Sequence, residues 1–289
     1  MLKLDEKNRA GGPSCGQVRM AEPMTPRTLE ALGVPGPVPA ATRDFAPDGD
    51  WTMTYRVWGG HGWIDCAYKT LGVLRIERIA GSDFAGADFR LGVEQRIVYQ
   101  GGIVQTLDAQ AHCAADTIGS LRQWTLRSEI TRTSGEPEPR LGLTYRAEVA
   151  EDGRSWRETV GGVRESAAEH ALDAPLTGDW VLFEAVQRLA FGPVESAQFN
   201  ILEGLTMLKR ENRLHFRETP EDGLQQQPLP LHRFYRFGRA QLPFDYWVDD
   251  DHRVVMAISG SRAYFLEEDP EPLFEATLEQ QRQGKGYHG

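Results

Sequence analysis

The sequence lacks any long apolar segment. No window of the 289 residues approaches the run of about 18 consecutive apolar residues that a membrane-spanning helix needs. The N-terminal region also lacks the apolar core of about seven residues that a secretory signal peptide requires. These absences predict a cytoplasmic protein or, if a leader is missing from the sequence, a protein of the bacterial periplasm.

Cysteine is scarce. The chain has only Cys15, Cys66 and Cys113, and an odd, sparse set of this kind does not make a disulfide framework. A single Cys66–Cys113 bridge stays open, but free cysteine is among the most buried residue types, so we expect two small buried side chains on neighbouring strands. No C-x-x-C pair is present, so a zinc site is not indicated.

Motifs for cofactors and for common catalytic chemistry are also missing. We find no phosphate loop, dinucleotide fingerprint, nucleophile elbow or metal cage, and we therefore expect no cofactor and no metal. The run Asp249-Asp250-Asp251 lacks the spaced ligands, central glycine and distant glutamate of a calcium loop. With 32 basic and 42 acidic residues, the net charge of −10 repels polyanions, so nucleic acid is not an expected partner.

The composition that is present is that of a soluble globular protein, with 40% hydrophobic and 26% charged residues. The length suits one main domain. Residues 1–50 are rich in glycine and proline and predict a flexible or surface-lying arm, with one short helix at Thr25–Leu32. A β-rich domain is expected over residues 51–267, and a C-terminal helix and tail over residues 268–289.

The strongest local pattern is a β-hairpin near the C-terminus. The aromatic segment Leu242–Asp250 runs through an aspartate-rich turn into the β-branched segment Arg253–Gly260. Similar strands separated by short turns extend back to Trp51, with an Asp-Gly hairpin turn at Glu151–Arg154. The spacing is typical of an antiparallel meander. The segments that predict these other strands are 52–58, 71–79, 89–99, 102–107, 121–130, 141–149, 155–163, 198–202, 205–210, 213–217, 231–237 and 262–266.

Helical spacing interrupts the meander once. Apolar residues between Val181 and Leu189 recur on one face, which predicts an amphipathic helix within Thr177–Leu189 that covers one face of the sheet or plugs one end. Pro272–Gln283 predicts a short terminal helix. The fold class is therefore mainly β: a curved antiparallel sheet or half-barrel, lipocalin-like, with one or two short helices.

This order of elements, with the Leu242–Asp249 strand and the segment Ser259–Tyr264 at its end, resembles uncharacterised β-rich proteins of bacterial envelopes. Those proteins are similar to the periplasmic lipoprotein carriers, whose half-barrel closes over a helix and holds an acyl chain. The resemblance covers roughly residues 50–267 and carries no catalytic motif. It implies a curved sheet with an apolar concavity and a hydrophobic ligand.

Candidate catalytic residues come from two segments. In the first, His61 lies among glycines, and Asp65 could orient its imidazole for acid–base chemistry; on a strand both would share a face with Trp63. In the second, His112 beside Cys113 could supply another base. The alternatives are a glycine-rich hairpin loop with an exposed histidine, and a histidine with no catalytic duty.

Candidate ligand-binding residues lie on aromatic and basic strands. His215 alternates with two arginines on one strand and could receive an anion. In the segment 231–239, Arg233, Tyr235 and Phe237 should face one way, and Arg236 the other with His232 and Phe234. Such a mixture suits a sugar or an anionic lipid head group, or plain packing of aromatic rings. The tryptophans and tyrosines expected to line a concavity are Trp58, Trp63, Tyr246 and Trp247.

Three functions fit these observations. The preferred hypothesis is a binding or carrier protein that holds an apolar or amphipathic small molecule or lipid in a concavity of the sheet. The alternative is a lyase, isomerase or hydrolase with His61 and Asp65 as an acid–base pair and Arg233 or Arg236 holding an anionic substrate; it requires His61 to converge with His112 or His215. The third is an interaction module that uses a sheet edge or the N-terminal arm. No motif specifies the ligand or the oligomeric state.

Overall fold

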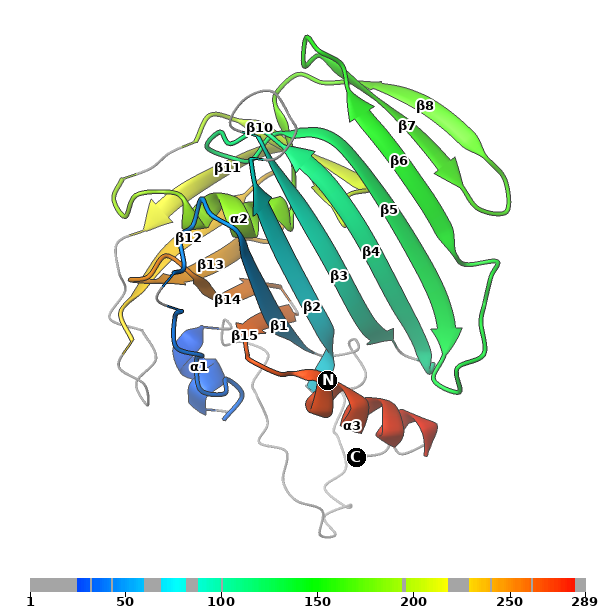
Figure 1. Ribbon diagram of the computed structural model, residues 1–289, viewed down its shortest axis with the longest axis vertical. Coiled ribbons are helices and arrows are strands. Elements are labelled where there is room, and N and C mark those ends of the chain that lie inside the picture. The colour runs from blue at the N-terminus through cyan, green and yellow to red at the C-terminus, as the bar shows by residue number, and fades with distance from the viewer. Residues whose placement is uncertain are drawn as a thin grey trace, which may run out of the picture.

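The computed structural model describes residues 25–31, 33–42, 44–59, 69–81, 88–99, 101–193, 196–217, 229–239, 241–260 and 262–283. Within these ranges, one sheet of 15 strands dominates the molecule (Figure 1). No helix in the described residues is long and apolar enough to cross a membrane.

The strands follow one another as two meanders. The bounds are β1 (Trp51–Gly59), β2 (Lys69–Ala80), β3 (Phe89–Tyr99), β4 (Ile103–Cys113), β5 (Leu121–Arg132), β6 (Leu143–Val149), β7 (Ser155–Gly161), β8 (Ser166–Ala171), β9 (Leu176–Gly178), β10 (Phe199–Glu203), β11 (Met207–Arg217), β12 (Leu231–Phe237), β13 (Phe244–Asp249), β14 (Val254–Ser259) and β15 (Arg262–Leu266).

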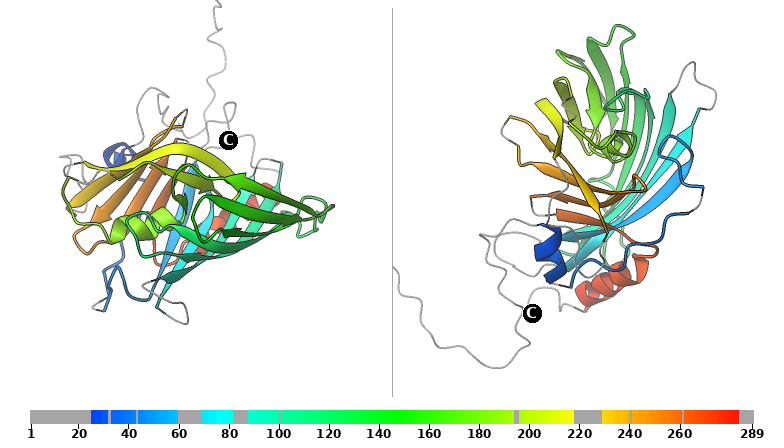
Figure 2. Two further views of the ribbon diagram at one scale, coloured as in Figure 1. Left: turned by 90° about the horizontal axis from the view of Figure 1, so that it is seen from above. Right: turned by 90° about the vertical axis from the view of Figure 1, so that its left-hand side faces the viewer.

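The order of strands in the sheet is β8-β7-β6-β5-β4-β3-β2-β1-β15-β14-β13-β12-β11-β10-β9. The chain therefore starts in the middle of the sheet, runs out to β8, crosses to the opposite edge at β9 and returns until β15 pairs with β1. All neighbours are antiparallel except β9 and β10. Figure 2 shows the sheet curled so that its two halves face each other. This confirms the predicted fold class, a mainly β, curved antiparallel sheet.

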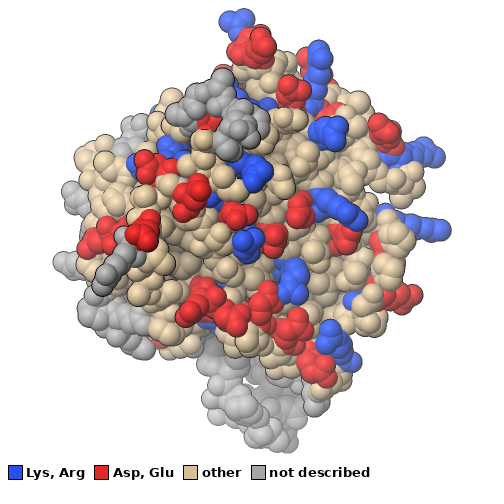
Figure 3. All heavy atoms as spheres, in the orientation of Figure 1, with Lys and Arg blue, Asp and Glu red and all other residues tan. Residues whose placement is uncertain are grey.

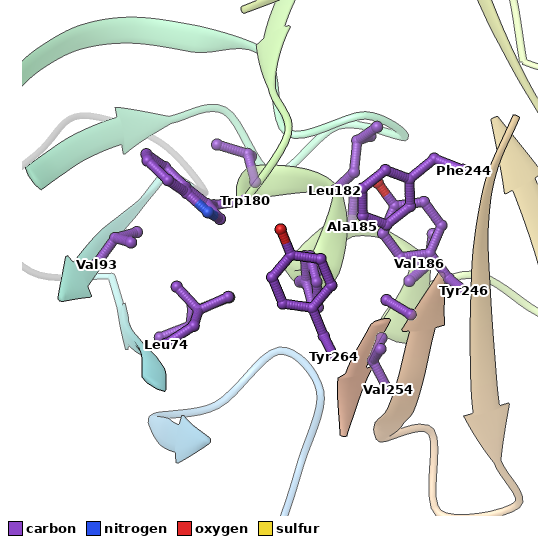
Figure 4. Packing of buried hydrophobic residues seen from close by; sticks show 14 of the residues in the cluster. Leu74, Val93, Trp180, Leu182, Ala185, Val186, Phe244, Tyr246, Val254 and Tyr264 are labelled. Carbon is purple, nitrogen blue, oxygen red and sulfur yellow. The ribbon is translucent and has the colours of Figure 1, made fainter. Parts of the chain in front are cut away.

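A short helix fills the interior of the curl. Helix α2 (Val181–Gln187) is buried at every residue, including Glu184. The Phe183 ring meets Tyr55, Tyr246 and Tyr264 at centroid distances of 5.2–5.7 Å, which joins α2 to β1, β13 and β15. Figure 4 shows Tyr246 and Tyr264 beside the helix. The helix is present where it was predicted, but it is shorter and buried on all sides, so the expected amphipathic pattern was wrong.

The outer face of the sheet is covered by both terminal segments. Helix α1 (Pro26–Ala31) buries Leu29, and the Val34 carbonyl oxygen accepts a hydrogen bond from Arg56 on β1. Helix α3 (Glu271–Arg282) buries Phe274 against β2–β4. The division into an arm, a β domain and a C-terminal tail stays a prediction.

Most strands lie where alternation predicted them. The hairpin β13–β14 is confirmed, and so is the turn between β6 and β7, where Gly153 has φ +68°. Two predicted strands, 205–210 and 213–217, form the single strand β11, bent at Glu211 with φ +59°. Strands β8 and β9 were not predicted, because β8 is mostly exposed and β9 has only three residues.

Antiparallel pairing sorts the loops into two ends of the curled sheet. At the first end lie the connections β3–β4, β5–β6, β7–β8, β10–β11, β12–β13 and β14–β15; we call it the cavity end. At the opposite end lie the segment before β1 and the connections β2–β3, β4–β5, β6–β7 and β13–β14. Helix α2 follows β9 and starts on the side of the cavity end, because β9 runs parallel to β10 and finishes there.

Candidate functional site

A cavity of about 350 Å³ lies inside the curl toward the cavity end. Its walls come from strands on both halves of the sheet and from the segment that leads into α2. Its apolar surface is made by Leu107, Leu126, Leu143, Trp180 and Phe244. Its polar surface includes Gln95, Tyr99, Gln105, Ser128, Asp179, Glu203, Thr206, Arg236, Ser259, Arg262 and Tyr264. The lining is thus more polar than the apolar concavity expected from the sequence.

Arg236 is the most distinctive side chain in this wall. It points inward from β12 and is only 2% exposed. Among the described residues, its guanidinium makes long polar contacts, 3.5 Å to Asn212 Oδ1, 3.4 Å to Gln241 Oε1 and 3.8 Å to Glu203 Oε1, and its Cζ lies 5.4 Å from the Phe244 ring centroid. Its buried Nε has no hydrogen-bond partner in the described part of the chain. Because buried polar groups are nearly always hydrogen-bonded, this arginine has donor capacity that the protein itself leaves unused.

A second arginine lines the same cavity from β15. The Arg262 guanidinium interacts with Tyr99 and Tyr264, and its Cζ lies 5.9 Å from the Tyr99 ring centroid. Burial raises the pKa of Tyr264, and the Arg262 charge partly offsets that rise. The Tyr264 hydroxyl therefore stays protonated at neutral pH, and two cationic side chains contribute to one cavity.

Asp179 is a buried acid in the cavity wall, which also contains Glu203. It follows β9, and its two carboxylate oxygens accept backbone hydrogen bonds of 3.0 Å from Trp180 and Gly204. Burial raises the pKa of Asp179 to about 6, against the lowering effects of those two hydrogen bonds and of Arg236. The carboxyl group is therefore held in one orientation and changes charge just below neutral pH.

A different arrangement occupies the opposite end of α2. There Glu184 accepts hydrogen bonds from Arg78 Nε at 2.8 Å and from Arg188 Nε at 2.6 Å, and all three side chains are largely buried. A cavity of about 680 Å³ adjoins this cluster and is also lined by Gln187 and His252. The two arginines here donate hydrogen bonds to carboxylate and carbonyl oxygens, so this cluster is suited to holding α2 in place.

Among the described residues, no group of three or more histidine, cysteine, aspartate and glutamate side chains is placed to hold a metal ion. Cys113 is a free, buried thiol on β4, as expected for a small core side chain. Burial raises its pKa well above the ordinary thiol value, and nearby carboxylates add to that rise. This thiol is therefore not an activated nucleophile.

Of the predicted site residues that the structure describes, two face the interior. Arg236 lines the cavity, and Tyr246 on β13 is buried near it, with a hydroxyl that has no hydrogen-bond partner among the described residues. The prediction that Arg236 shares a face with His232 and Phe234, away from Tyr235, is consistent with their ring contacts: Phe191 stacks on His232 at 3.6 Å and lies 6.5 Å from Phe234.

The other described candidates face away from the cavity. The His215 ring stacks between Tyr235 and Phe237 at 5.2 and 5.0 Å on the outer side of β11 and β12. Arg233 pairs with Asp245 and lies 5.3 Å from the Trp247 ring centroid. Trp58 packs in the core beside Phe265, on the opposite side of the sheet from Tyr264.

Of the predicted catalytic residues, the structure describes only His112. His112 lies on β4 between the buried inward residues Ala111 and Cys113, so it faces outward, next to Arg90. Burial lowers the pKa of His112, and the Arg90 charge adds to that effect. His112 and His215 therefore do not share a pocket. His61, Trp63 and Asp65 lie outside the described residues, as does Cys66.

Sequence reasoning missed Asp179, Arg262 and most of the cavity wall. Asp179 was interpreted only as part of a helix start, and Arg262 only as part of a strand. A usable signal was present in Arg262 and Tyr264: two residues apart on a strand, they share the inward face. For Asp179 the sequence offers no comparable signal, because its partner Gly204 lies 25 positions away.

Comparisons with known proteins leave the function open. No family model matches the chain, and no curated protein matches it. Among solved structures, the chain is similar to the crystal structure of a β-barrel-like protein of domain of unknown function DUF1849 from Brucella abortus. The TM-score is 0.47 and the identity 7%, over 76% of this chain and 96% of that chain. Function must therefore be inferred from the cavity itself.

Proposed function

We propose that this protein binds a small amphipathic molecule with an anionic head group in the cavity beside α2. Arg236 carries this proposal. A buried guanidinium whose Nε is unpaired and whose contacts with Asn212, Gln241 and Glu203 are 3.4–3.8 Å long is poorly satisfied without a ligand. A carboxylate, sulfate or phosphate group would supply the missing acceptors, and arginine is the side chain best shaped to recognise them.

The remaining wall suits the rest of such a molecule. Leu107, Leu126 and Leu143 on β4–β6 face Trp180 and Phe244 across the interior and offer apolar contacts to a short alkyl or ring system. A volume of about 350 Å³ lies at the lower end of the range of about 300–1,000 Å³ that is usual for small-molecule pockets. The resemblance to lipoprotein carriers stays a prediction, and the proposed ligand is smaller than a carrier's lipid cargo.

Calorimetric titration with decyl sulfate, decanol and decyltrimethylammonium tests the proposal, because the three probes share a chain length and differ in head-group charge. A hydrogen bond to a charged group contributes about 1.5–3 kcal/mol, so we expect decyl sulfate to bind about ten-fold or more tighter than decanol. Arg236→Gln should remove that preference. Arg233→Gln is the matched control, since Arg233 lies on the same strand but faces outward.

Equal binding of the three probes, or an undiminished preference in Arg236→Gln, would contradict the proposal. Arg236→Lys separates charge from geometry, because it keeps the positive charge without the planar fork of donors. It should retain part of the preference for decyl sulfate. Thermal unfolding of each variant is measured in parallel, so that a loss of binding is not mistaken for a loss of fold.

A second candidate function is acid–base catalysis in the same cavity, and Asp179 favours it. A carboxyl group with a pKa of about 6, fixed by two backbone hydrogen bonds beside a protonated tyrosine and two arginines, has the properties of a general acid or base. The predicted His61–Asp65 pair lies outside the described residues and stays a separate prediction. Turnover of a bound anion that is lost in Asp179→Asn while binding persists would establish it.

A further inference from the structure

The cavity beside Glu184, here called the second cavity, lies at the end of the molecule opposite the cavity end. Its volume of about 680 Å³ is within the range of about 300–1,000 Å³ that is usual for small-molecule pockets. Its wall comes from the segment before β1, from the β2–β3, β4–β5 and β13–β14 connections, and from the end of α2. Four small residues leave space between the polar side chains of this wall, namely Pro47, Ala80, Gly81 and Ala115.

Gln187 is a polar side chain of this wall with an unused hydrogen-bonding atom. It is the last residue of α2 and is 0% exposed. Its Nε2 donates a 3.0 Å hydrogen bond to the Phe183 carbonyl oxygen, whereas its buried Oε1 has no partner among the described residues. Because the donor side of the amide is fixed by Phe183, the unused atom is an acceptor. A ligand that satisfies this atom must therefore bring a hydrogen-bond donor.

His252 is fixed at the same wall. Its backbone has φ +64°, a left-handed conformation that residues other than glycine adopt rarely. Its ring stacks on Phe191 at a centroid distance of 4.2 Å. Its Nδ1 is buried and has no hydrogen-bond partner in the described part of the chain. The second cavity therefore borders two buried polar atoms that the described residues leave unpaired.

The charges in this wall favour a cation. Arg78 and Arg188 each donate hydrogen bonds to Glu184 and to backbone carbonyl oxygens, so their charges are already used within the protein. Asp48 and Asp88 add two carboxylates to the lining. With Glu184 behind the arginines, three carboxylates accompany two guanidinium groups. The wall thus has an excess of negative charge as well as an unused acceptor.

The connections around the second cavity are acidic too. Besides Asp48 and Asp88, the segment 44–50 and the three connections contain Asp44, Asp50, Asp116, Asp250 and Asp251. Among the described residues of these four segments, the only basic side chain is Arg253, which pairs with Asp249 at 2.6 Å. On the face seen in Figure 3, by contrast, acidic and basic side chains are mixed. The acidic surroundings are therefore a local feature that attracts cations to this end.

We propose that the second cavity binds a small organic cation that carries N–H donors, such as a primary amine or a guanidinium compound. The N–H groups would donate to Gln187 Oε1 and to the carboxylate of Asp48 or Asp88. Hydrogen bonds between a charged donor and a carboxylate are among the strongest in proteins. This site lies at the opposite end of α2 from the cavity proposed to bind an anion, and it does not depend on that proposal.

Calorimetric titration with four probes of one chain length tests the proposal: 1,4-diaminobutane, its fully methylated bis-quaternary form, 1,4-butanediol and succinate. We expect the diamine to bind about ten-fold or more tighter than the diol, because its donors are charged. The quaternary form keeps both charges but has no N–H donor, so it should bind about ten-fold weaker than the diamine. Succinate should not bind. Physiological ionic strength is used, since it screens exposed charges beyond about 8 Å.

Two variants and a matched control locate the bound diamine. Gln187→Met removes the unpaired acceptor and Asp88→Asn removes a negative charge, and each should weaken diamine binding about ten-fold. Asp251→Asn removes the same charge from an exposed position beside His252 that does not line the second cavity, so it should change the affinity less than about two-fold. Thermal unfolding is measured for all three. Asp88 is half-buried in a connection, so Asp88→Asn keeps the test decisive if Gln187→Met does not fold.

Several outcomes would overturn the proposal. Absence of diamine binding would exclude it, and succinate binding as tight as that of the diamine would show that the arginines dominate the wall. Equal binding of the quaternary form would remove the need for N–H donors. Equal losses in Asp251→Asn and Asp88→Asn would place the diamine on the acidic surface instead of in the cavity. Decyl sulfate titration should be unchanged by saturating diamine, so the two binding proposals can fail independently.

Discussion

The raised pKa of Asp179 predicts a measurable loss of stability as pH increases. In the folded protein the pKa is about 6, compared with an ordinary value of 3.8. Between these values the folded state binds more protons than the unfolded state, so the free energy of unfolding falls as pH rises through this window. The full difference corresponds to roughly 3 kcal/mol, present below pH 3.8 and lost above pH 6. About 1.4 kcal/mol of it remains at pH 5 and almost none at pH 7.5.

Asp179→Asn isolates this contribution, because asparagine cannot ionise. Urea unfolding of both proteins, followed by tryptophan fluorescence, gives the free energy of unfolding at pH 5, 6 and 7.5. We expect the unmodified protein to lose about 1.4 kcal/mol relative to the variant across this range. A pH-independent difference in the free energy of unfolding between the two proteins does not report on the Asp179 pKa, since asparagine cannot accept both backbone hydrogen bonds of the aspartate.

Asp173→Asn supplies the control for this experiment. Asp173 is exposed, and hydrogen bonding to Asn200 lowers its pKa, so its contribution is lost only as pH falls below the ordinary aspartate range. Its difference from the unmodified protein should therefore be flat between pH 5 and 7.5. A difference that is equally flat for Asp179→Asn would refute the inference that burial raises the pKa of Asp179.

Three further predictions follow from the geometry. Glu184→Ala should lower the free energy of unfolding, measured in urea, by about 3–5 kcal/mol, because it leaves two buried arginines without their carboxylate partner. Glu94→Ala, which removes an exposed ion pair, should lower it by about 1 kcal/mol or less, and equal losses in the two variants would contradict the buried cluster. The affinity for decyl sulfate, measured by calorimetry, should rise as pH falls from 7.5 to 5, since protonation of Asp179 removes a negative charge from the cavity. Asp179→Asn should show no such rise. A rise in that variant would mean that another group causes the pH dependence. Gly72→Ala should prevent folding, as measured by circular dichroism, because the new Cβ would lie 1.9 Å from a backbone carbonyl oxygen of β3. Gly92→Ala should fold, because its new Cβ meets no atom closer than 3.7 Å. Normal folding of Gly72→Ala would mean that β2 and β3 pair in a different register.

Prediction from the sequence succeeded where a pattern is local. The hairpin β13–β14 follows from an aromatic strand, a short aspartate-rich turn and a β-branched strand, all within 19 residues of Leu242. The helix α2 was located by its apolar spacing. Its burial on all sides was not predictable from the sequence. Glu184 is enclosed by Arg78 on β2 and by Arg188 after the helix, and the curl of the sheet brings Arg78 to this position.

The candidate site, in contrast, could not be predicted from local sequence patterns. Its wall combines Tyr99 on β3, Asp179 before α2, Arg236 on β12 and Arg262 on β15. No spacing rule links positions so far apart in the chain. Alternation along a strand separates the inward Arg236 from the outward Arg233, but it does not say which of the two faces is enclosed. The outward face carries as many aromatic and basic residues as the inward one, which is why His215 and Tyr235 were equally plausible ligand contacts.

The class of fold, the meander, the positions of α2 and α3 and the acidic character of the chain follow from composition or from periodicity over about ten residues, so they were predictable from the sequence. Three features appear only in the folded molecule: β15 pairs with β1, α2 is enclosed, and two arginines share one cavity with a carboxyl group of raised pKa. These features depend on which strands become neighbours and on how far the sheet curls. Both result from long-range packing, since burial and charge act through distance in space and not through separation along the chain.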